Sequence, residues 1–311
     1  LRIKCFEISC NAISSLLRQA NAIWYNVADI LTEYFKEVLF MTEHARDSLK
    51  DAKRIVIKVG TSTLTHETGK MNLLRMDRLS MAISELVNRG HEIILVSSGA
   101  IGVGMGKLNM KERPRIMGMK QALAAIGQCE LMNIYSKLFA SYNQVVAQVL
   151  LTKYDVDDDI KRVNIENTFK HLLEKHVIPI VNENDTVSTD EIMSMDHFGD
   201  NDTLSAVVAR LVRADLLIIL SDIDGFYDAD PRENKDCKLI DTVTEIDDYI
   251  WHCAGGEGTK FGTGGMVTKL NAANIVIHSG INMVLASGSD PFIVFDILNG
   301  ENVGTLFVAQ N

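Results

Sequence analysis

Residues 54–97 read RIVIKVGTSTLTHETGKMNLLRMDRLSMAISELVNRGHEIILVS, two short apolar runs separated by a helical pattern. The runs at 54–59 and 91–97 are rich in Ile, Val and Leu, as in strands that are buried on both faces. Between them, residues 76–89 carry apolar side chains three and four positions apart and stop at Gly90, which is typical of a helix with a C-terminal glycine. This stretch therefore predicts a strand–helix–strand unit whose two strands run parallel.

The same alternation of strand and helix patterns continues to the end of the chain. Further strands are expected at 145–151, 177–181, 215–220, 281–286 and 304–309, and further helices at 114–142, 163–175, 201–212 and 265–278. The fold class is therefore α/β, a three-layer sandwich with a mainly parallel sheet covered by helices on both faces. In such folds ligands bind beyond the carboxyl ends of the strands, so we expect the chemistry in the loops that follow them.

Composition excludes several classes of protein. The chain has 311 residues, of which 47% are hydrophobic and 23% charged, so it is neither disordered nor of low complexity. Its net charge of −10 argues against nucleic acid as the main ligand. Five widely spaced cysteines without a CxxC pair argue against a disulfide framework or a zinc site and favour a reducing, cytoplasmic location. No run reaches the roughly 18–20 apolar residues that cross a membrane.

The first 50 residues differ in pattern from the rest. Between Ile13 and Val38, apolar residues recur at helical spacing, and Met41 and a polar stretch follow. Arg2 and Lys4 precede an uncharged run, which leaves a signal peptide as an alternative. We expect a helical N-terminal extension over residues 1–50, with Met41 a possible natural start, and one α/β domain over 51–311.

Three segments after predicted strands or before a predicted helix suit an anion. Lys58, followed by Gly-Thr-Ser, offers a cation beside backbone and hydroxyl donors, although a solvated lysine at a strand end is also common. The glycine-rich stretch 97–107 matches neither a Walker A loop nor a dinucleotide fingerprint, which leaves a loop that donates N–H groups to an anion, or a tight structural turn. The stretch 262–269 (GTGGMVTK) opens a helix and is the most specific phosphate signal.

Two clusters of Asn and Asp flank a predicted hairpin at 186–193. The first is 182–185 (NEND) and the second is 199–202 (GDND). One such residue is enough to cap the helix that follows, so a cluster favours binding of an ammonium group or of cations. A third polar segment, 221–231 (SDIDGFYDADP), is either a turn or part of the same site.

Six stretches together resemble the amino acid kinase family, and within it the members that phosphorylate glutamate. They occur in the family's order: IKVGTSTLT from Ile57, VSSGAIGVG from Val96, VNENDTVSTDEI from Val181, FGDNDTLSA from Phe198, SDIDGFYDADPR from Ser221 and GTGGMVTK from Gly262. The resemblance implies the amino acid kinase fold and transfer of a phosphoryl group from MgATP to the γ-carboxylate of L-glutamate, the first step of proline biosynthesis. It further implies a cytoplasmic homo-oligomer, a dimer or tetramer, that proline inhibits.

The resemblance also implies roles for individual residues. Lys58 and Lys269 would neutralise the phosphoryl oxygens, and Asp202 would hold both lysines. The residues implied to contact glutamate are Ser98, Asn182, Asp185, Asp200 and Asn201. Those implied to bind ATP are Lys58, Ser221, Asp222, Thr263, Gly264, Gly265, Met266, Val267, Thr268 and Lys269. The cofactors are ATP and Mg²⁺, and we expect no metal ligand from the protein, no nucleic acid and no membrane.

The chemistry of a carboxylate acceptor agrees with this reading. A carboxylate with a pKa of about 4.3 is already ionised at neutral pH, so no general base is needed, and the scattered histidines are interpreted as surface or structural residues. The pattern departs from the family in the extension, in a longer link around 194–197 and at the C-terminus, where we expect no PUA domain. The alternatives are the kinase half of a bifunctional pyrroline-5-carboxylate synthase, a sister kinase acting on another carboxylate or carbamate, and a non-catalytic amino-acid sensor.

Overall fold

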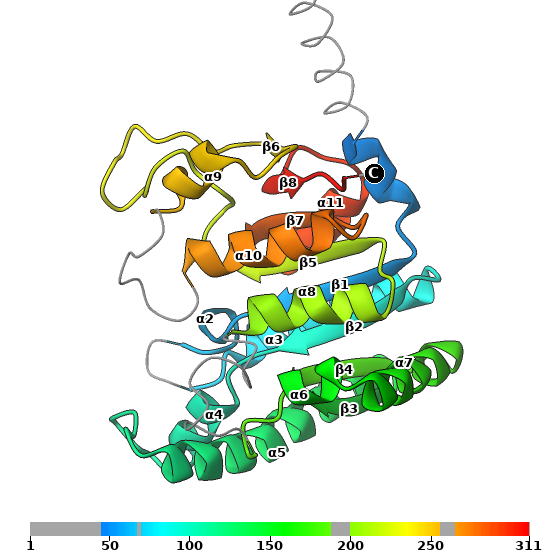
Figure 1. Ribbon diagram of the computed structural model, residues 1–311. Helices are drawn as coiled ribbons and strands as arrows, with labels where there is room; N and C mark the ends of the chain where they lie inside the picture. Colours follow the sequence, from blue (N-terminus) through cyan, green and yellow to red (C-terminus); the bar gives the residue numbers. More distant parts are fainter. Residues whose placement is uncertain (1–44, 67–69, 188–199, 256–264, 311) are drawn as a thin grey trace, which may run out of the picture. The chain divides into compact units, whose positions relative to one another are not determined.

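The computed structural model describes residues 45–66, 70–187, 200–255 and 265–310 (Figure 1). Contacts within the chain divide it into two units, residues 1–45 and 46–311. The first unit and the predicted hairpin at 186–193 lie almost entirely outside the described residues. The second unit holds every described helix and strand.

The described strands of this unit form one sheet in the order β3-β4-β2-β1-β5-β7-β8-β6. Their bounds are β1 Arg54–Val59, β2 Glu92–Ser97, β3 Val146–Leu151, β4 Ile178–Glu183, β5 Leu216–Ser221, β6 Thr242–Val243, β7 Asn282–Ser287 and β8 Thr305–Phe307. Neighbours from β3 to β7 pair in parallel, whereas β8 runs antiparallel to β7. The prediction of a mainly parallel sheet is confirmed.

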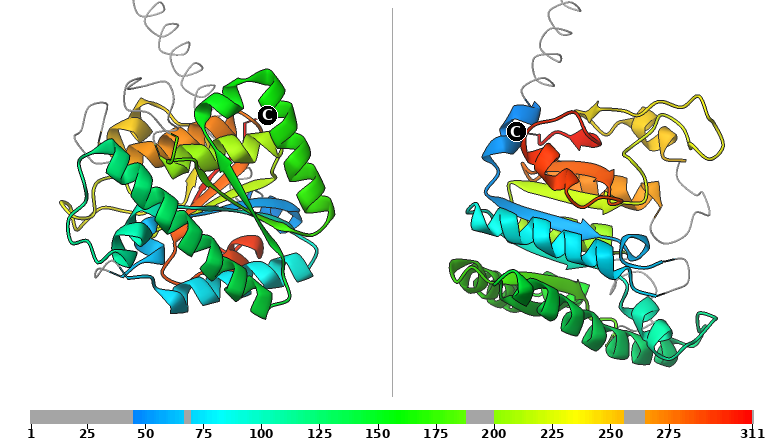
Figure 2. Two further views of the ribbon diagram at one scale, coloured as in Figure 1. Left: turned by 90° about the horizontal axis from the view of Figure 1, so that it is seen from below. Right: turned by 180° about the vertical axis from the view of Figure 1, so that it is seen from behind.

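Helices cover both faces of the sheet (Figure 2). On one face α8 packs against the central strands and against α10, and α7 contacts β4; on the other lie α3, α5 and α11. The helices are η1 Ser48–Asp51, α2 Thr61–Leu64, α3 Leu73–Asn88, α4 Ala100–Lys107, α5 Met117–Ser141, α6 Lys153–Asp157, α7 Asp159–Glu174, α8 Asn201–Leu211, α9 Asp248–Cys253, α10 Met266–Ile277 and α11 Ile293–Leu298. The predicted three-layer architecture is therefore present.

The core lies between the central strands and these two helical layers. Every residue of β5 is buried, and β1 and β2 are buried from their second residue onward. Each fully buried Leu, Ile or Val side chain contributes about 1.5–3 kcal/mol, which explains why strands of such composition occupy the centre. Their carboxyl ends are thereby held on a rigid frame.

The glycine-rich stretch 97–107 is not the loop that we expected. The turn is short, with Gly99 in the left-handed region at φ 98°, and helix α4 begins at Ala100. A Cβ on Gly104 would lie 2.1 Å from the carbonyl oxygen of Leu123, and one on Gly127 would lie 1.7 Å from that of Ala100. These two glycines therefore allow α4 and α5 to touch along their backbones. Residues 100–107 form a helix rather than a loop, and anion binding by the N–H groups of the short turn before it stays a prediction.

Several short elements were not predicted. These are β6, α2, α6, α9 and α11, each of six residues or fewer.

The second unit also includes part of the segment that the sequence assigns to the extension, residues 46–50. There Arg46 donates to the carbonyls of Asp241, Glu301 and Val303, and Leu49 is buried. Among the described helices, none is long and apolar enough to cross a membrane.

Candidate active site

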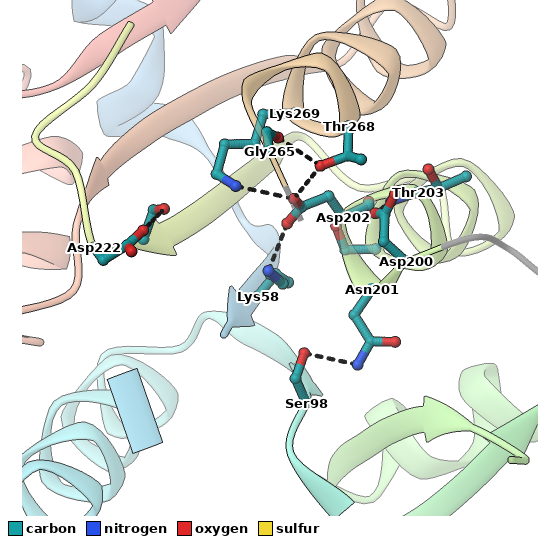
Figure 3. Close-up of polar contacts among 12 residues, drawn as sticks. Lys58, Ser98, Asp200, Asn201, Asp202, Thr203, Asp222, Gly265, Thr268 and Lys269 are labelled. Carbon is teal, nitrogen blue, oxygen red and sulfur yellow. Dashed lines mark hydrogen bonds and ion pairs between the residues drawn. The ribbon is translucent and has the colours of Figure 1, made fainter. Parts of the chain in front are cut away.

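Polar and charged side chains gather where the central parallel strands end. β1, β2, β4 and β5 all finish at this edge, and the first turns of α8 and α10 face it (Figure 3). Parallel strands bring their carboxyl ends to one side, so residues far apart in the sequence become neighbours here. The site has two parts, which we name the charged cluster and the amide cluster.

The charged cluster consists of Lys58, Asp202 and Lys269. The Nζ atom of Lys58 lies 2.5 Å from one carboxylate oxygen of Asp202, and Nζ of Lys269 lies 3.2 Å from the other. All three side chains are buried, with 10%, 1% and 6% of their surface exposed. A solvated strand-end lysine at position 58 is therefore excluded. A buried charge needs a partner, and here one carboxylate serves two lysines.

Three different elements deliver these groups. Lys58 is the penultimate residue of β1, Asp202 is the second residue of α8, and Lys269 lies in the first turn of α10. Thr268 adds a third contact to Asp202, because its hydroxyl lies 3.0 Å from that carboxylate and 2.7 Å from the carbonyl oxygen of Gly265. The threonine thus ties the start of α10 to the carboxylate of α8.

The two acidic residues at the start of α8, Asp200 and Asp202, have pKa values that are shifted in opposite directions. Burial alone would raise the pKa of Asp202, but the adjacent Lys58 and Lys269 outweigh it and hold that pKa below its usual value. Asp200 has a raised pKa, because of burial first and the neighbouring Asp202 charge second. Asp200 also caps α8, accepting from the Thr203 backbone N–H at 2.8 Å. One carboxylate is thus stabilised as an anion and the other is not.

The amide cluster consists of Ser98, Asn182, Asn201 and Gln128. The side-chain nitrogen of Asn201 lies 2.8 Å from the Ser98 hydroxyl, 2.9 Å from the Asn182 side-chain oxygen and 3.2 Å from the carbonyl oxygen of Ser97. The nitrogen of Asn182 donates in turn to Gln128 at 2.9 Å. This network links the ends of β2 and β4 to the start of α8 and to the middle of α5.

The remaining predicted residues lie around these two clusters. Ser221 ends β5, and its hydroxyl donates to the carboxylate of Asp222 at 3.0 Å. Figure 3 shows Asp222 on the side of Lys269 that faces away from Asp200. Gly265, Met266 and Val267 form the start of α10. Asp185 is half-buried in the turn after β4. Thr263 and Gly264 lie outside the described residues.

The sequence did not single out Gln128 or Tyr135, which α5 contributes from its buried face. The Tyr135 hydroxyl lies 3.0 Å from that of Ser97, at the end of β2. Both residues occupy positions at which α5 otherwise carries apolar or small side chains. A polar side chain at a position that the helical pattern assigns to the buried face is the signal by which the sequence could have indicated Gln128 and Tyr135.

The arrangement is suited to transferring an anionic group. Two lysines and one carboxylate leave one positive charge in excess, in a site with little access to water. The N–H groups of the first turn of α10, which no side chain caps in the described part of the chain, add a positive dipole end next to it. Fold and site together define a phosphotransferase of the three-layer α/β type, because charge stabilisation is the main requirement of phosphoryl transfer.

The chain belongs to the amino acid kinase family, whose model matches residues 53–287. It is 58% identical over 265 residues to the glutamate 5-kinase of Clostridium perfringens, a match that covers 85% of this chain and 98% of the relative. The glutamate 5-kinase of Listeria innocua is 53% identical over 265 residues, covering 85% of this chain and 96% of the relative.

Solved structures share the fold at much lower identity. The carbamate kinase of Giardia lamblia superposes with a TM-score of 0.60 at 17% identity, over 84% of this chain and all of that one. The UMP kinase of Ureaplasma parvum gives a TM-score of 0.56 at 15% identity, over 83% of this chain and 99% of that one. The predicted amino acid kinase fold is confirmed.

Proposed function

We propose that this protein transfers the γ-phosphoryl group of ATP to the γ-carboxylate of L-glutamate, forming L-glutamyl 5-phosphate and ADP, the first step of proline biosynthesis. The observation that carries the proposal is the buried charged cluster Lys58–Asp202–Lys269, with the amide cluster beside it. Relatives that are 52–58% identical over most of the chain are glutamate 5-kinases, which supports glutamate as the acceptor.

The reaction needs charge neutralisation more than proton transfer. A carboxylate oxygen of glutamate attacks the γ-phosphorus, the bond to the β–γ bridging oxygen breaks, and ADP leaves with the electron pair. The acceptor is already ionised at neutral pH. The obstacle is repulsion between two anions, worth about 4 kcal/mol per unit-charge pair at 4 Å and an effective dielectric constant of about 20. Lys58 and Lys269 are placed to offset it, and Asp202 keeps both ammonium groups in position.

The amide cluster and its acidic neighbours are suited to the amino-acid part of the acceptor. The nitrogen of Asn201 already faces three acceptors, so its side-chain oxygen is left for the substrate's ammonium group. Asp185 and Asp200 add carboxylates for that ammonium, and Asn182 and Ser98 hold Asn201 in place. This division assigns glutamate binding to the ends of β2 and β4 and the start of α8.

The nucleotide then belongs on the side of β5 and α10. Ser221, Asp222 and the start of α10 from Gly265 to Lys269 are placed there, and Thr263 and Gly264 precede them in the sequence. No group of three His, Cys, Asp or Glu side chains gathers within the described part of the chain. We propose that Mg²⁺ is held mainly by the ATP phosphates, where it would neutralise charge on the leaving group.

Further properties of the proposal rest on the family resemblance. Proline is proposed as a feedback inhibitor, the enzyme as a cytoplasmic homo-oligomer, dimer or tetramer, and nucleic acid and membranes as no part of its function. The net charge of −10 supports the exclusion of nucleic acid.

A single assay tests the proposed reaction. The purified full-length protein is incubated with ATP, Mg²⁺ and hydroxylamine, and the hydroxamate formed from the acyl phosphate is measured. We expect product with L-glutamate, much less with L-aspartate or N-acetyl-L-glutamate, and none without ATP or Mg²⁺. Equal or faster turnover of another carboxylate would overturn glutamate as the acceptor.

A further inference from the structure

Gln128 is a buried amide in the middle of α5, with 7% of its surface exposed. It shares the buried face of that helix with Leu131 and Tyr135, which lie one and two turns further along. A surface helix usually packs apolar side chains against the sheet. Because Gln128 is a polar residue on that side of α5, we expect it to be there for its hydrogen bonds rather than for packing.

The hydrogen bonds around Asn182 fix which way the Gln128 amide points. The backbone N–H of Glu183 donates to the side-chain oxygen of Asn182 at 2.9 Å, and Asn201 donates to the same oxygen. The side-chain nitrogen of Asn182 must therefore face Gln128. Since that nitrogen is a donor, Gln128 presents its oxygen to it, at 2.9 Å.

The other end of the same amide is left without a partner. In the described part of the chain, Nε2 of Gln128 is buried and makes no hydrogen bond. Burying an unpaired donor costs stability, and a leucine of similar size would avoid that cost. Within the described part of the chain, the oxygen is thus the atom through which this amide makes a hydrogen bond.

We propose that Gln128 is a positioning residue of the acceptor site: its oxygen locks the rotamer of Asn182, which holds Asn201 toward the substrate. The inference rests on the proposed function, because the acceptor in question is glutamate. Among the described residues, Gln128 makes no hydrogen bond with Lys58 or Lys269, which pair with Asp202. Its loss therefore weakens acceptor binding and leaves nucleotide binding and the charged cluster unchanged.

The test compares Gln128→Leu with Asn133→Leu, the same kind of substitution at an exposed position of α5. We expect Gln128→Leu to raise the KM for glutamate about tenfold, with the KM for ATP and kcat within about threefold of wild type. Its melting temperature should stay close to that of wild type, since one unpaired buried donor replaces another. Asn133→Leu should leave all four quantities unchanged.

A double-mutant cycle shows whether Gln128 acts through Asn182. Asn182→Ala alone should raise the KM for glutamate more than Gln128→Leu does, and adding Gln128→Leu to it should change the KM by less than about twofold. A glutamate KM within twofold of wild type in Gln128→Leu, or effects that multiply in the double variant, would overturn the inference. Failure of the wild-type protein to phosphorylate glutamate would instead overturn the proposed function.

Discussion

The charged cluster and the amide cluster meet at adjacent residues, Asp202 and Asn201, yet they are stabilised differently. In the charged cluster a single carboxylate neutralises two buried lysines, so removing one member leaves a buried charge without its partner. In the amide cluster all groups are neutral: Asn201 donates a hydrogen bond to Asn182, and Asn182 donates one to Gln128. Removing one member frees the side-chain orientation of the next. The charged cluster thus keeps ionised groups in a buried site, and the amide cluster fixes the orientation of neutral side chains.

This difference has a kinetic consequence. Charge that lies where negative charge develops stabilises the transition state more than the bound substrate, and so acts on kcat. Groups that orient the amino-acid part of the acceptor bind it equally in both states, and so act on KM. Substitutions in the two clusters should therefore separate into two kinetic classes, with the largest effects in the charged cluster.

Asp202→Asn should have the largest effect on stability. It leaves Lys58 and Lys269 facing each other across a neutral amide in a buried site. Breaking a buried ion pair by removing one partner costs about 3–5 kcal/mol. Urea unfolding of the variant and of wild type at pH 7 measures the difference, and a loss below about 1 kcal/mol would show that the two lysines find other partners.

The same variant predicts a pH dependence. The pKa of Asp202 is lowered in the folded protein, so its contribution to stability is complete above its ordinary pKa of 3.8 and is lost as the pH falls through the lower, folded value. Below that value the carboxyl is protonated and resembles the amide. We expect the gap in unfolding free energy between wild type and Asp202→Asn to close on acidification below about pH 4.

Lys58→Ala and Lys269→Ala should come next in size, now on turnover. Both ammonium groups are buried and share one carboxylate, which is the arrangement expected of pre-organised charge donors. We expect kcat to fall about 10²- to 10³-fold in each variant, with smaller changes in either KM. Arginine should rescue poorly, because its wide planar group does not replace a compact ammonium.

Lys161→Ala is the matched control for the two lysines. Lys161 also pairs with an aspartate, Asp155 at 2.9 Å, but its side chain is 45% exposed. Exposed pairs contribute little, so turnover should stay within about twofold of wild type. If Lys58→Ala and Lys269→Ala, shown by circular dichroism to be folded, also lose less than tenfold in kcat, the charged cluster has only a structural role.

The elements that the sequence predicted are those whose own composition defines them. Residues 54–59 and 215–220 are mostly Ile, Leu and Val, and they form most of the buried strands β1 and β5. The two-residue β6 and the short helix α11 carry no such signal, because partners far away in the sequence hold them in place. The glycines of 97–107 left two interpretations open, since a close approach of two helices and a loop around an anion require the same residue. The structure shows the close approach at Gly104.

The site shows the same limit. Lys58, Asp202 and Lys269 were found because each stands in a motif, and the fold only had to bring the motifs together. Gln128 stands in no motif, and its partner Asn182 is 54 residues away. A glutamine within a helical pattern is usually at the surface, so only the packing of α5 reveals it.

Asp185→Asn should have a moderate effect, confined to the acceptor. Asp185 lies in the turn after β4, beside the end of the strand that carries Asn182, and we propose that its carboxylate binds the ammonium group of glutamate. Loss of that charge should raise the KM for glutamate about tenfold and leave the KM for ATP within twofold. Asp157→Asn, at an exposed position in α6 after the neighbouring strand, should change neither. A loss of ATP affinity in Asp185→Asn would mean that the two halves of the site are assigned the wrong way round.

Asp200→Asn should have the smallest effect on stability, and of opposite sign to Asp202→Asn. Burial and the charge of Asp202 raise the pKa of Asp200, so its ionised form opposes folding at neutral pH. Asparagine caps a helix as well as aspartate does, and can keep the hydrogen bond from the Thr203 N–H. The variant should therefore be more stable than wild type at pH 7, by about 0.5 kcal/mol, while its KM for glutamate rises.

The sign of this last effect can be followed with pH and with a second variant. Because the folded pKa of Asp200 is raised above its ordinary value of 3.8, the cost of its charge is absent below that value, grows as the pH rises from 3.8 to the folded pKa, and is complete above it. The advantage of Asp200→Asn should accordingly vanish below about pH 4. Asp200→Ala removes the charge and the cap together, so it should be about 1 kcal/mol less stable than Asp200→Asn at every pH. An Asp200→Asn protein that is less stable than wild type at pH 7 would mean that the start of α8 needs this charge, and that both acidic residues belong to the charged cluster.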